Sequence, residues 1–279
     1  MQIKEYHRRI DGKTLLYVRQ CMPDAKPDGI VMMLHGTGEH CGCYAQWANR
    51  FTGHSTGCIL FDWRGHGRSS GKRGHAALSG LKSDLHAMIR TAREEYPQTR
   101  IFLYGHSMGG LIALACAMDE RPEITGVIAS SPWMELLHPP PPLLARTAAI
   151  ASLLFPSWTV RTGIKAEQLA MNGSQKSSKT DALIHKRISV KLFTDLRQAA
   201  GEVLQNRYQP HLPVLLMFGK EDRLVSRRAG ELLAGRIASV EYKLWDGMGH
   251  DLPHEVHNDA VFYYVLNWMI RQIRKDGNV

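Results

Sequence analysis

The chain contains the stretch Leu103-Tyr104-Gly105-His106-Ser107-Met108-Gly109-Gly110 between two apolar segments. The run that leads into it, Ile101 to Tyr104, predicts a buried strand, and the run Leu111 to Met118 after it predicts a buried helix. Between them lies the pattern Gly-x-Ser-x-Gly, whose serine is held on a sharp strand-to-helix turn with its hydroxyl exposed. Gly105 and Gly109 leave room for the close backbone approach in such a turn. The flanking strand and helix make this common pattern a strong indication of a serine nucleophile.

The rest of the chain alternates between apolar runs and helical patterns. An initial hairpin is predicted where Asp11-Gly12 separates two strand-like runs, Tyr6–Ile10 and Thr14–Gln20. Continuous apolar runs predict buried parallel strands, and they are Ile30–Leu34, Cys58–Phe61, Ile101–Tyr104, Gly126–Ser130, Val214–Phe218 and Val240–Trp245. Helices are expected over Leu78–Tyr96, Met108–Met118, Ser226–Ile237 and Val256–Arg274. A hairpin followed by repeated strand–helix units predicts an α/β fold with a mostly parallel sheet and helices on both faces.

One stretch in the second half of the chain interrupts this alternation, because it contains no clear buried strand. It opens with the prolines of Pro139–Pro142, which cannot continue a helix, and goes on with the apolar run Leu143–Phe155. We expect a helical cap, or lid, over residues 134–210 and an α/β core formed by residues 1–133 and 211–279. Ligands of open α/β sheets bind at the carboxyl edge of the strands, so a lid there would shape the pocket and exclude water.

The composition fits one globular α/β domain with an insertion. The 279 residues are 44% hydrophobic and carry a net charge of +9. The basic side chains are scattered rather than gathered in one dense tract with interleaved aromatic residues, so we do not expect nucleic-acid binding. A positive field favours anionic lipid surfaces or acidic substrates, and a solvated basic surface without a partner explains it equally well. The sequence leaves the oligomeric state open.

The cysteines and the first residues of the chain favour a cytoplasmic location. There are five cysteines, an odd number, and Cys41-Gly-Cys43 lacks the spacing of a redox or zinc pair. The plain interpretation is reduced, mostly buried thiols in a reducing compartment. Residues Met1 to Arg9 show no apolar run of a signal peptide. No stretch reaches about 18 uninterrupted apolar residues, so we expect no membrane-spanning helix.

A serine nucleophile needs a base and an acid, and the order of the strands predicts where they lie. A serine hydroxyl is a weak nucleophile at neutral pH, so a histidine must take its proton and a carboxylate must hold that histidine. In this architecture the chain order is Ser, then Asp or Glu, then His. Asp222 follows the predicted strand Val214–Phe218 and is the expected acid, with Glu221 as the fallback. A helix cap near Ser226 is the alternative role of either carboxylate.

The predicted base follows the next strand. His250 lies in the glycine-rich loop after Val240–Trp245, where the glycines suit a side chain presented at a loop tip. His254 and His257 are the rivals, but they lie in or near the final predicted helix. We expect these two histidines at the surface.

Two backbone amides are expected to bind the oxyanion of a tetrahedral intermediate. One belongs to Met108, the residue after the predicted nucleophile Ser107. The other belongs to the loop after the first parallel strand, and Thr37 is the best candidate among residues His35 to His40. Such chemistry requires no organic cofactor and no metal.

A second dense motif runs from Phe61 to Gly71 and mixes Asp, Arg and His. We expect it to be structural, with Asp62 and Arg64 tying together the turn at the end of a strand while the glycines let the loop bend. A metal site is not expected, because the sequence shows no second cluster of ligand residues.

Together these segments resemble the monoacylglycerol lipase and lysophospholipase branch of the α/β-hydrolases. The segments that carry the resemblance are Leu34–His40, Tyr44, Asp62–Ser69, Gly71–His75, Gly105–Gly110, Ser130–Pro132, Gly219–Val225 and His250. The resemblance covers nearly the whole chain outside the lid. It implies the eight-stranded α/β-hydrolase fold, a Ser-His-Asp triad of Ser107, His250 and Asp222, and a cap over the pocket. In such enzymes the cap often has an apolar outer surface that meets membranes, a part that Leu143–Phe155 would play.

The function expected from the sequence is hydrolysis of a carboxylic ester in a monoacylglycerol or lysophospholipid-like substrate through an acyl-enzyme on Ser107. The same triad could act on a thioester, a non-lipid ester or an aminoacyl amide. A non-catalytic binding protein on this fold is the remaining alternative. An aspartate nucleophile, as in epoxide hydrolases and dehalogenases, is disfavoured because the turn holds Ser107. The acyl and alcohol specificity is not readable, because the resemblance fades in the lid.

Overall fold

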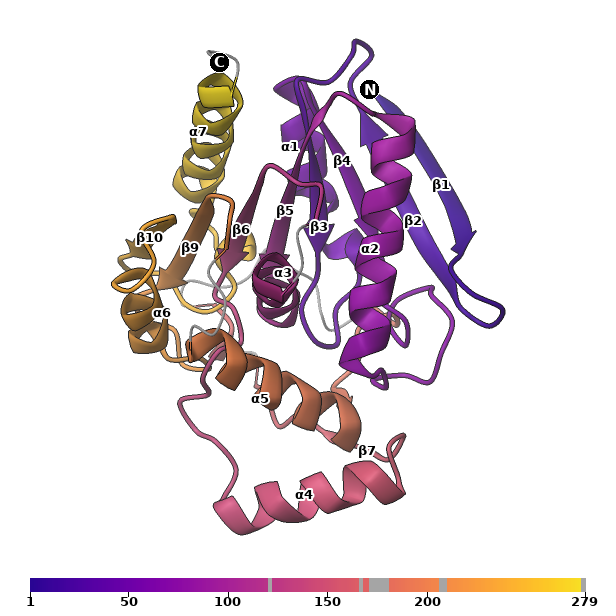
Figure 1. The fold of residues 1–279 in the computed structure, drawn as a ribbon, viewed down its shortest axis with the longest axis vertical. Coiled ribbons are helices and arrows are strands. Elements are labelled where there is room, and N and C mark those ends of the chain that lie inside the picture. Colours follow the sequence, from indigo (N-terminus) through magenta and orange to yellow (C-terminus); the bar gives the residue numbers. More distant parts are fainter. Residues whose placement is uncertain (120–121, 166–167, 171–180, 206–209, 277–279) are drawn as a thin grey trace.

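A computed structural model describes residues 1–119, 122–165, 168–170, 181–205 and 210–276 of the chain. Within these residues, eight strands form one sheet in the order β1-β2-β4-β3-β5-β6-β9-β10 (Figure 1). Their bounds are β1 Gln2–Arg9, β2 Leu15–Met22, β3 Gly29–Leu34, β4 Thr56–Phe61, β5 Arg100–His106, β6 Gly126–Ser130, β9 Val214–Gly219 and β10 Val240–Trp245. Strand β2 pairs antiparallel with both β1 and β4, and all other pairs are parallel. The predicted eight-stranded, mostly parallel sheet is therefore confirmed.

The sheet separates two hydrophobic cores, because successive side chains of a strand point to opposite faces. On β5, Ile101 and Leu103 join one cluster, whereas Phe102 and Tyr104 join the other. Helices α2 (Leu78–Glu95), α3 (Met108–Asp119) and α6 (Arg227–Ala234) contribute to the first cluster. Helices α1 (Ala45–Gly53) and α7 (Asp259–Asp276) contribute to the second. With both faces covered, the central strands are buried along nearly their whole length, as their continuous apolar runs predict.

The register of the parallel strands brings the loops that follow them to one edge of the sheet. Leu34, the last residue of β3, pairs with Gly105 near the end of β5. Gly219, the last residue of β9, pairs with Trp245, the last residue of β10. The loops that start from these positions therefore leave the sheet at the same level, where an α/β sheet binds its ligands.

The segment between β6 and β9 contains α4 (Pro142–Leu154), β7 (Thr159–Arg161), β8 (Arg187–Ser189) and α5 (Val190–Leu204). Figure 1 shows α5 beyond the carboxyl edge of the sheet and α4 beyond α5. The expectation that this segment lacks buried strands needs correction. Strands β7 and β8 pair antiparallel, and Ile188 and Ser189 are buried. Three-residue strands are too short to produce a readable alternation in the sequence.

The proposed limits of the cap, residues 134–210, stay a prediction, and residues 166–167, 171–180 and 206–209 of that stretch lie outside the described residues. Helix α1 is an addition to the helices expected from the sequence, whereas α5 lies within the stretch expected to form a helical cap. None of the described helices is both long enough and apolar enough to cross a bilayer.

Candidate active site

Ser107 lies on the sharp turn between β5 and α3, with a backbone φ of +52°. This left-handed conformation is costly for a residue other than glycine and here is held by its neighbours. The Ser107 amide donates to the Ser130 carbonyl at 2.9 Å. A Cβ atom at Gly105 would collide with the carbonyl of Gly109, and one at Gly109 with the carbonyl of Leu34. The two glycines are therefore required by close backbone packing, as the motif predicts.

The side chains of Asp222 and His250 are hydrogen-bonded to each other. The Nδ1 atom of His250 lies 2.8 Å from Oδ2 of Asp222, and both side chains are almost completely buried. The other oxygen, Oδ1, accepts from the amides of Leu224 and Val225 at 2.8 and 3.0 Å, which fixes the carboxylate. Since an ionised carboxylate only accepts hydrogen bonds, Nδ1 carries the ring hydrogen and Nε2 is the basic nitrogen. The fallback acid Glu221 is exposed and takes no part in this pair.

The pair shifts the pKa values of both groups toward the charged forms. Burial lowers the pKa of His250, but the carboxylates of Asp222, Asp251 and Glu39 together raise it above its ordinary value. Burial raises the pKa of Asp222, but His250 and the two backbone amides outweigh it and leave that pKa below its usual range. The site is therefore built to stabilise an imidazolium next to a carboxylate.

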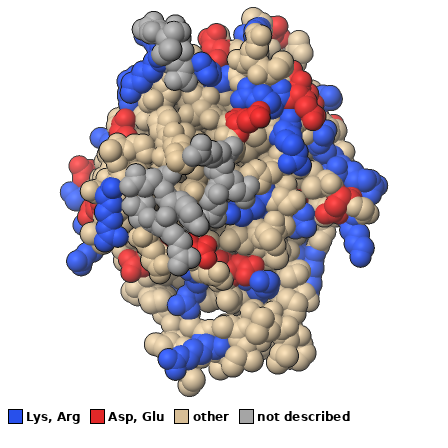
Figure 2. Space-filling view, in the orientation of Figure 1, with Lys and Arg blue, Asp and Glu red and all other residues tan. Residues whose placement is uncertain are grey.

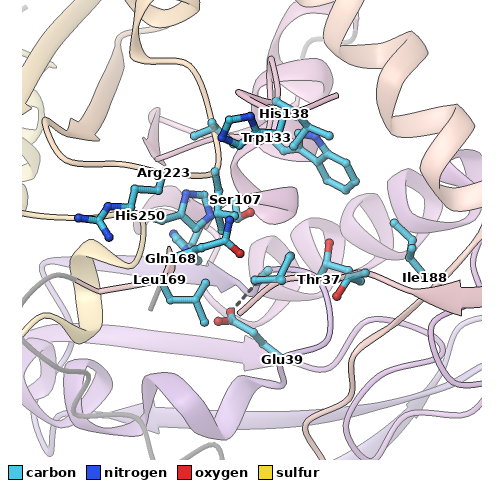
Figure 3. A pocket seen from close by; sticks show the side chains of 18 of the residues that line it. Thr37, Glu39, Ser107, Trp133, His138, Gln168, Leu169, Ile188, Arg223 and His250 are labelled. Carbon is cyan, nitrogen blue, oxygen red and sulfur yellow. Dashed lines mark hydrogen bonds between the residues drawn. The ribbon is translucent and has the colours of Figure 1, made fainter. Parts of the chain in front are cut away.

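Ser107 and His250 line the same cavity, which has a volume of about 280 Å³ (Figure 3). Thr37 lies on its wall as well, because the loop after β3 and the turn after β5 leave the sheet together. Much of the remaining wall is apolar and includes Trp133, Leu136, Ile188, Phe193, Leu224 and Val225. The cavity therefore combines an apolar wall with a small number of polar groups, which is typical of a small-molecule site.

The peptide between Gly36 and Thr37 has a fixed orientation. Its carbonyl, on Gly36, lies 2.9 Å from Nδ1 of His35 and accepts from the Glu39 amide at 3.3 Å. Nε2 of His35 accepts from the amide of Trp63, so Nδ1 is the donor. In a planar trans peptide the N–H points opposite to the C=O, so the Thr37 amide is directed away from these partners. This orientation is compatible with the role of an oxyanion donor.

The second predicted oxyanion donor belongs to Met108, the first residue of α3. The first amides of an α-helix have no partner within the helix, and the positive end of the helix dipole lies there. Met108 is buried directly after Ser107, so its amide meets the sequence requirement for this role. The catalytic roles of Ser107, Asp222 and His250, and the oxyanion roles of Thr37 and Met108, stay predictions.

The expectation for the Phe61–Gly71 motif is correct in part. Asp62 organises the turn, since it accepts from the amides of Cys41 at 2.7 Å and Arg68 at 2.6 Å. Arg64 does not join Asp62. Its guanidinium instead binds both carboxylate oxygens of Asp84, a fully buried residue of α2. The turn is therefore attached to α2, which begins more than ten residues later in the chain.

The expectation that His254 is a surface residue is wrong. His254 is buried in the short 3-10 turn Leu252–His254, before α7 begins. Its Nδ1 lies 2.6 Å from Oδ1 of Asp251 and its Nε2 lies 2.8 Å from the carbonyl of Cys43. His257 is exposed, as expected.

A buried polar network next to His250 was not anticipated from the sequence. Glu39, His106 and Asp251 bring ligand-type atoms within 4.8 Å of one another, so among the described residues this group has the geometry to hold a metal ion. Protein donors already engage it: Glu39 accepts from the Gly36 amide and the Tyr44 hydroxyl, both at 2.8 Å (Figure 3 draws the first of these bonds). The His106 ring lies 4.9 Å from the His250 ring. We interpret the group as support for His250 and assign no metal to it.

Residues 25–257 match the model of a family described as serine aminopeptidase, S33. The chain belongs to this α/β-hydrolase family. It is 28% identical over 261 residues to a protein named monoacylglycerol lipase from Mycolicibacterium smegmatis, covering 90% of this chain and 91% of that one. A crystal structure titled as a monoacylglycerol lipase of Paleococcus ferrophilus superposes with a TM-score of 0.81 at 26% identity, covering 92% and 99% of the two chains.

Another relative is much longer than the chain. The chain is 30% identical over 277 residues to an uncharacterized abhydrolase domain-containing protein of Dictyostelium discoideum. The match covers 95% of this chain but 29% of the Dictyostelium protein, so the chain spans less than a third of that relative's length.

Proposed function

We propose that the protein is a serine hydrolase that cleaves the carboxylic ester bond of a monoacylglycerol or a lysophospholipid-like molecule. The observation that carries the proposal is the arrangement of Ser107 and His250 on one cavity, with Asp222 bound to the far nitrogen of His250. The names of the Mycolicibacterium and Paleococcus relatives support the substrate class.

In the proposed reaction, the Oγ atom of Ser107 attacks the ester carbonyl while Nε2 of His250 takes the hydroxyl proton. The tetrahedral oxyanion accepts hydrogen bonds from the amides of Met108 and Thr37. Its collapse breaks the bond to the alcohol oxygen, and His250 gives its proton to the leaving alcohol. A water molecule, deprotonated by His250, then attacks the acyl-enzyme and releases the carboxylic acid. Asp222 stays ionised and stabilises the imidazolium in both halves of the cycle.

The wall of the cavity supports an apolar acyl group. Trp133 and Leu136 follow β6, and Ile188 and Phe193 come from β8 and α5, so the segment between β6 and β9 supplies most of this surface. Burying a hydrocarbon chain there releases about 25 cal/mol for each square ångström removed from water. The proposed cap over residues 134–210 thereby becomes part of the substrate site.

We also propose that α4 contacts a membrane peripherally. Its apolar side chains face solvent, and Leu143 and Leu153 are 74% and 82% exposed. Figure 2 shows that the end of the molecule formed by α4 is mostly uncharged, with basic and few acidic atoms near it. An exposed apolar helix on a protein with a net charge of +9 suits the interface of an anionic bilayer. None of the five cysteines, all of them described, forms a disulfide, which supports the proposed cytoplasmic location.

The deciding experiment is hydrolysis of monoacylglycerols over a series of acyl chain lengths, with wild type and Ser107→Ala compared. We expect long acyl chains to be cleaved faster than acetyl esters, and Ser107→Ala to be inactive while still folded. Activity retained by Ser107→Ala would refute the proposal. Failure of wild-type Ser107 to react with a fluorophosphonate probe would instead support a binding protein.

The family description favours one alternative, an amidase that uses the same residues on an aminoacyl amide. A parallel panel of aminoacyl p-nitroanilides and acyl thioesters tests it. Faster turnover of an amide or thioester than of any monoacylglycerol would replace the proposed substrate class without changing the mechanism.

A further inference from the structure

Residues 181–189, here called the strap, lie against residues 35–40, here called the oxyanion loop. The strap comes from the segment between β6 and β9, and the oxyanion loop follows β3. The His185 amide donates to the Gly38 carbonyl at 2.9 Å. Oδ2 of Asp181 lies 2.7 Å from Nε2 of His40. The strap therefore makes both a backbone and a side-chain contact to the loop that carries Thr37.

The pair of His40 and Asp181 is a directed hydrogen bond. Nδ1 of His40 accepts from the Gly42 amide at 3.2 Å, so the ring hydrogen of the neutral imidazole is on Nε2 and points to the carboxylate. Oδ1 of Asp181 accepts from the Leu183 amide at 2.9 Å, which holds the carboxylate in place. The His40 side chain is 10% exposed, so this bond is largely shielded from water.

Gly38 brings the two backbones into direct contact. It has a φ of +79°, and a Cβ atom there would collide with the carbonyl of His185. Gly36, on the other side of Thr37, is bound through its amide to Glu39. Thr37 therefore lies between Gly36, which is bound within the loop by Glu39, and Gly38, which is bound to the strap.

The far end of the strap is attached to the core as well. The Ser189 amide donates to the Gly74 carbonyl at 2.8 Å, and its hydroxyl lies 3.0 Å from Nδ1 of His75. Both partners lie in the loop before α2. The strap is thus attached to β7 and to the loop before α2 as well as to the oxyanion loop, and the hydrogen bonds to the oxyanion loop come from Asp181 and His185.

We propose that Asp181 and His40 are positioning residues, which hold the oxyanion loop so that the Thr37 amide faces the developing oxyanion. The inference rests on the proposed function, since it assigns the loop's role in the same acyl transfer. Loss of the bond leaves the Gly38 side of the loop held to the strap by the His185 amide alone, while Glu39 still holds the Gly36 amide. The transition state then loses stabilisation that the bound substrate does not receive. We therefore expect kcat to fall and KM to stay nearly constant.

The test uses Asp181→Ala, His40→Ala and the double variant on a water-soluble ester such as p-nitrophenyl butyrate, which removes membrane contact from the measurement. We expect kcat to fall about tenfold in each single variant with KM changed less than about twofold. The double variant should be no worse than the singles, because both remove one bond. Glu202→Ala, which removes an exposed carboxylate on α5 away from the loop, is the matched control and should behave as wild type.

A second readout separates positioning from general destabilisation. An alkyl trifluoromethyl ketone forms a tetrahedral adduct with an oxyanion, so its affinity should fall by the same factor as kcat/KM. Asp181→Asn, which keeps the side-chain shape, should lower kcat several-fold at an unchanged unfolding temperature. Wild-type kcat in Asp181→Ala, or a loss that only follows the folded fraction, would overturn the inference. Failure of the proposed function would show separately, as activity that survives Ser107→Ala.

Discussion

His250 and Asp222 lie 2.8 Å apart, Nδ1 to Oδ2, although 28 positions separate them in the chain. The contact results from the register in which β9 and β10 pair. Strands β9 and β10 are parallel neighbours that end level with each other, so the loops after them meet at one edge of the sheet. The proposed acid and base are therefore positioned by the pairing of two strands rather than by local sequence.

Replacing the acid should change the pH dependence of the reaction. In the proposed mechanism the active base is neutral His250, whose pKa is raised, so we expect wild-type kcat/KM to rise as the pH rises through that raised pKa. The substitution Asp222→Asn removes the carboxylate that contributes most to raising the pKa of His250. The acidic limb should move to lower pH, and kcat should fall on the order of 10⁴-fold, because the amide no longer holds the required tautomer.

Kinetic measurements between about pH 5 and pH 9 test this expectation. Asp246→Asn is the control, since Asp246 is an exposed carboxylate at the same edge of the sheet and is paired with Lys220. An acidic limb that stays in place in Asp222→Asn would show that Asp222 does not control His250.

The nucleophile position should be more stable with glycine than with alanine. At a φ of +52°, a Cβ atom costs about 1 kcal/mol, which glycine avoids. Ser107→Gly should therefore unfold at higher urea concentration than Ser107→Ala, while both lack ester hydrolysis. The same pair of substitutions at Ser152, inside helix α4, should give the opposite order. Equal stability of the two Ser107 variants would mean that the turn relaxes once the hydroxyl is removed.

The pair of Arg64 and Asp84 should contribute strongly to stability. Asp84 is fully buried and both of its oxygens bind the guanidinium. Asp84→Ala leaves Arg64 without this partner, and we expect a loss of about 3 kcal/mol in the free energy of unfolding. Glu241→Ala removes a more exposed carboxylate that pairs with Arg271, and should cost less than about 1 kcal/mol. Chemical denaturation of the two variants measures the difference, and similar losses would contradict the prediction.

Charges placed on α4 should weaken membrane binding without affecting the chemistry. Leu143→Glu with Leu153→Glu removes two exposed leucines, and we expect the partition onto anionic vesicles to fall about 100-fold. Turnover of p-nitrophenyl butyrate should stay at the wild-type rate. Leu232→Glu, at a 49% exposed leucine of α6, is the control for added charge. Unchanged co-sedimentation of the α4 variant would exclude this helix as the contact surface.

Sequence patterns predicted the sheet well because its strands are continuous apolar runs, which leave few other interpretations. Helix α5 also carried a signal: Ser189 caps it, and Leu192, Leu196 and Val203 follow at helical spacing on its buried face. This spacing agrees with the helical insertion expected over residues 134–210. Helix α1 is nine residues long and follows directly on a 3-10 turn, so its periodicity is too short to stand out.

The candidate site was predictable where chain order constrains it, as for Asp222 and His250. The network around them was not. His254 reaches the carbonyl of Cys43, 211 positions away, and Asp181 reaches His40 across 141 positions. Such contacts depend on how loops pack against one another in the folded protein, and no periodicity or motif in the chain encodes them.

If the exposed leucines of α4 hold the protein on a bilayer, they also decide which substrate concentration sets the reaction rate. A protein resting on a bilayer through this helix meets lipid molecules by diffusion in two dimensions, so the relevant quantity is molecules per unit area. Adding inert phospholipid at constant total substrate would then slow the reaction, because each bound enzyme would find fewer substrate molecules around it. Dissolved esters, which reach Ser107 from bulk water, would show no such dilution.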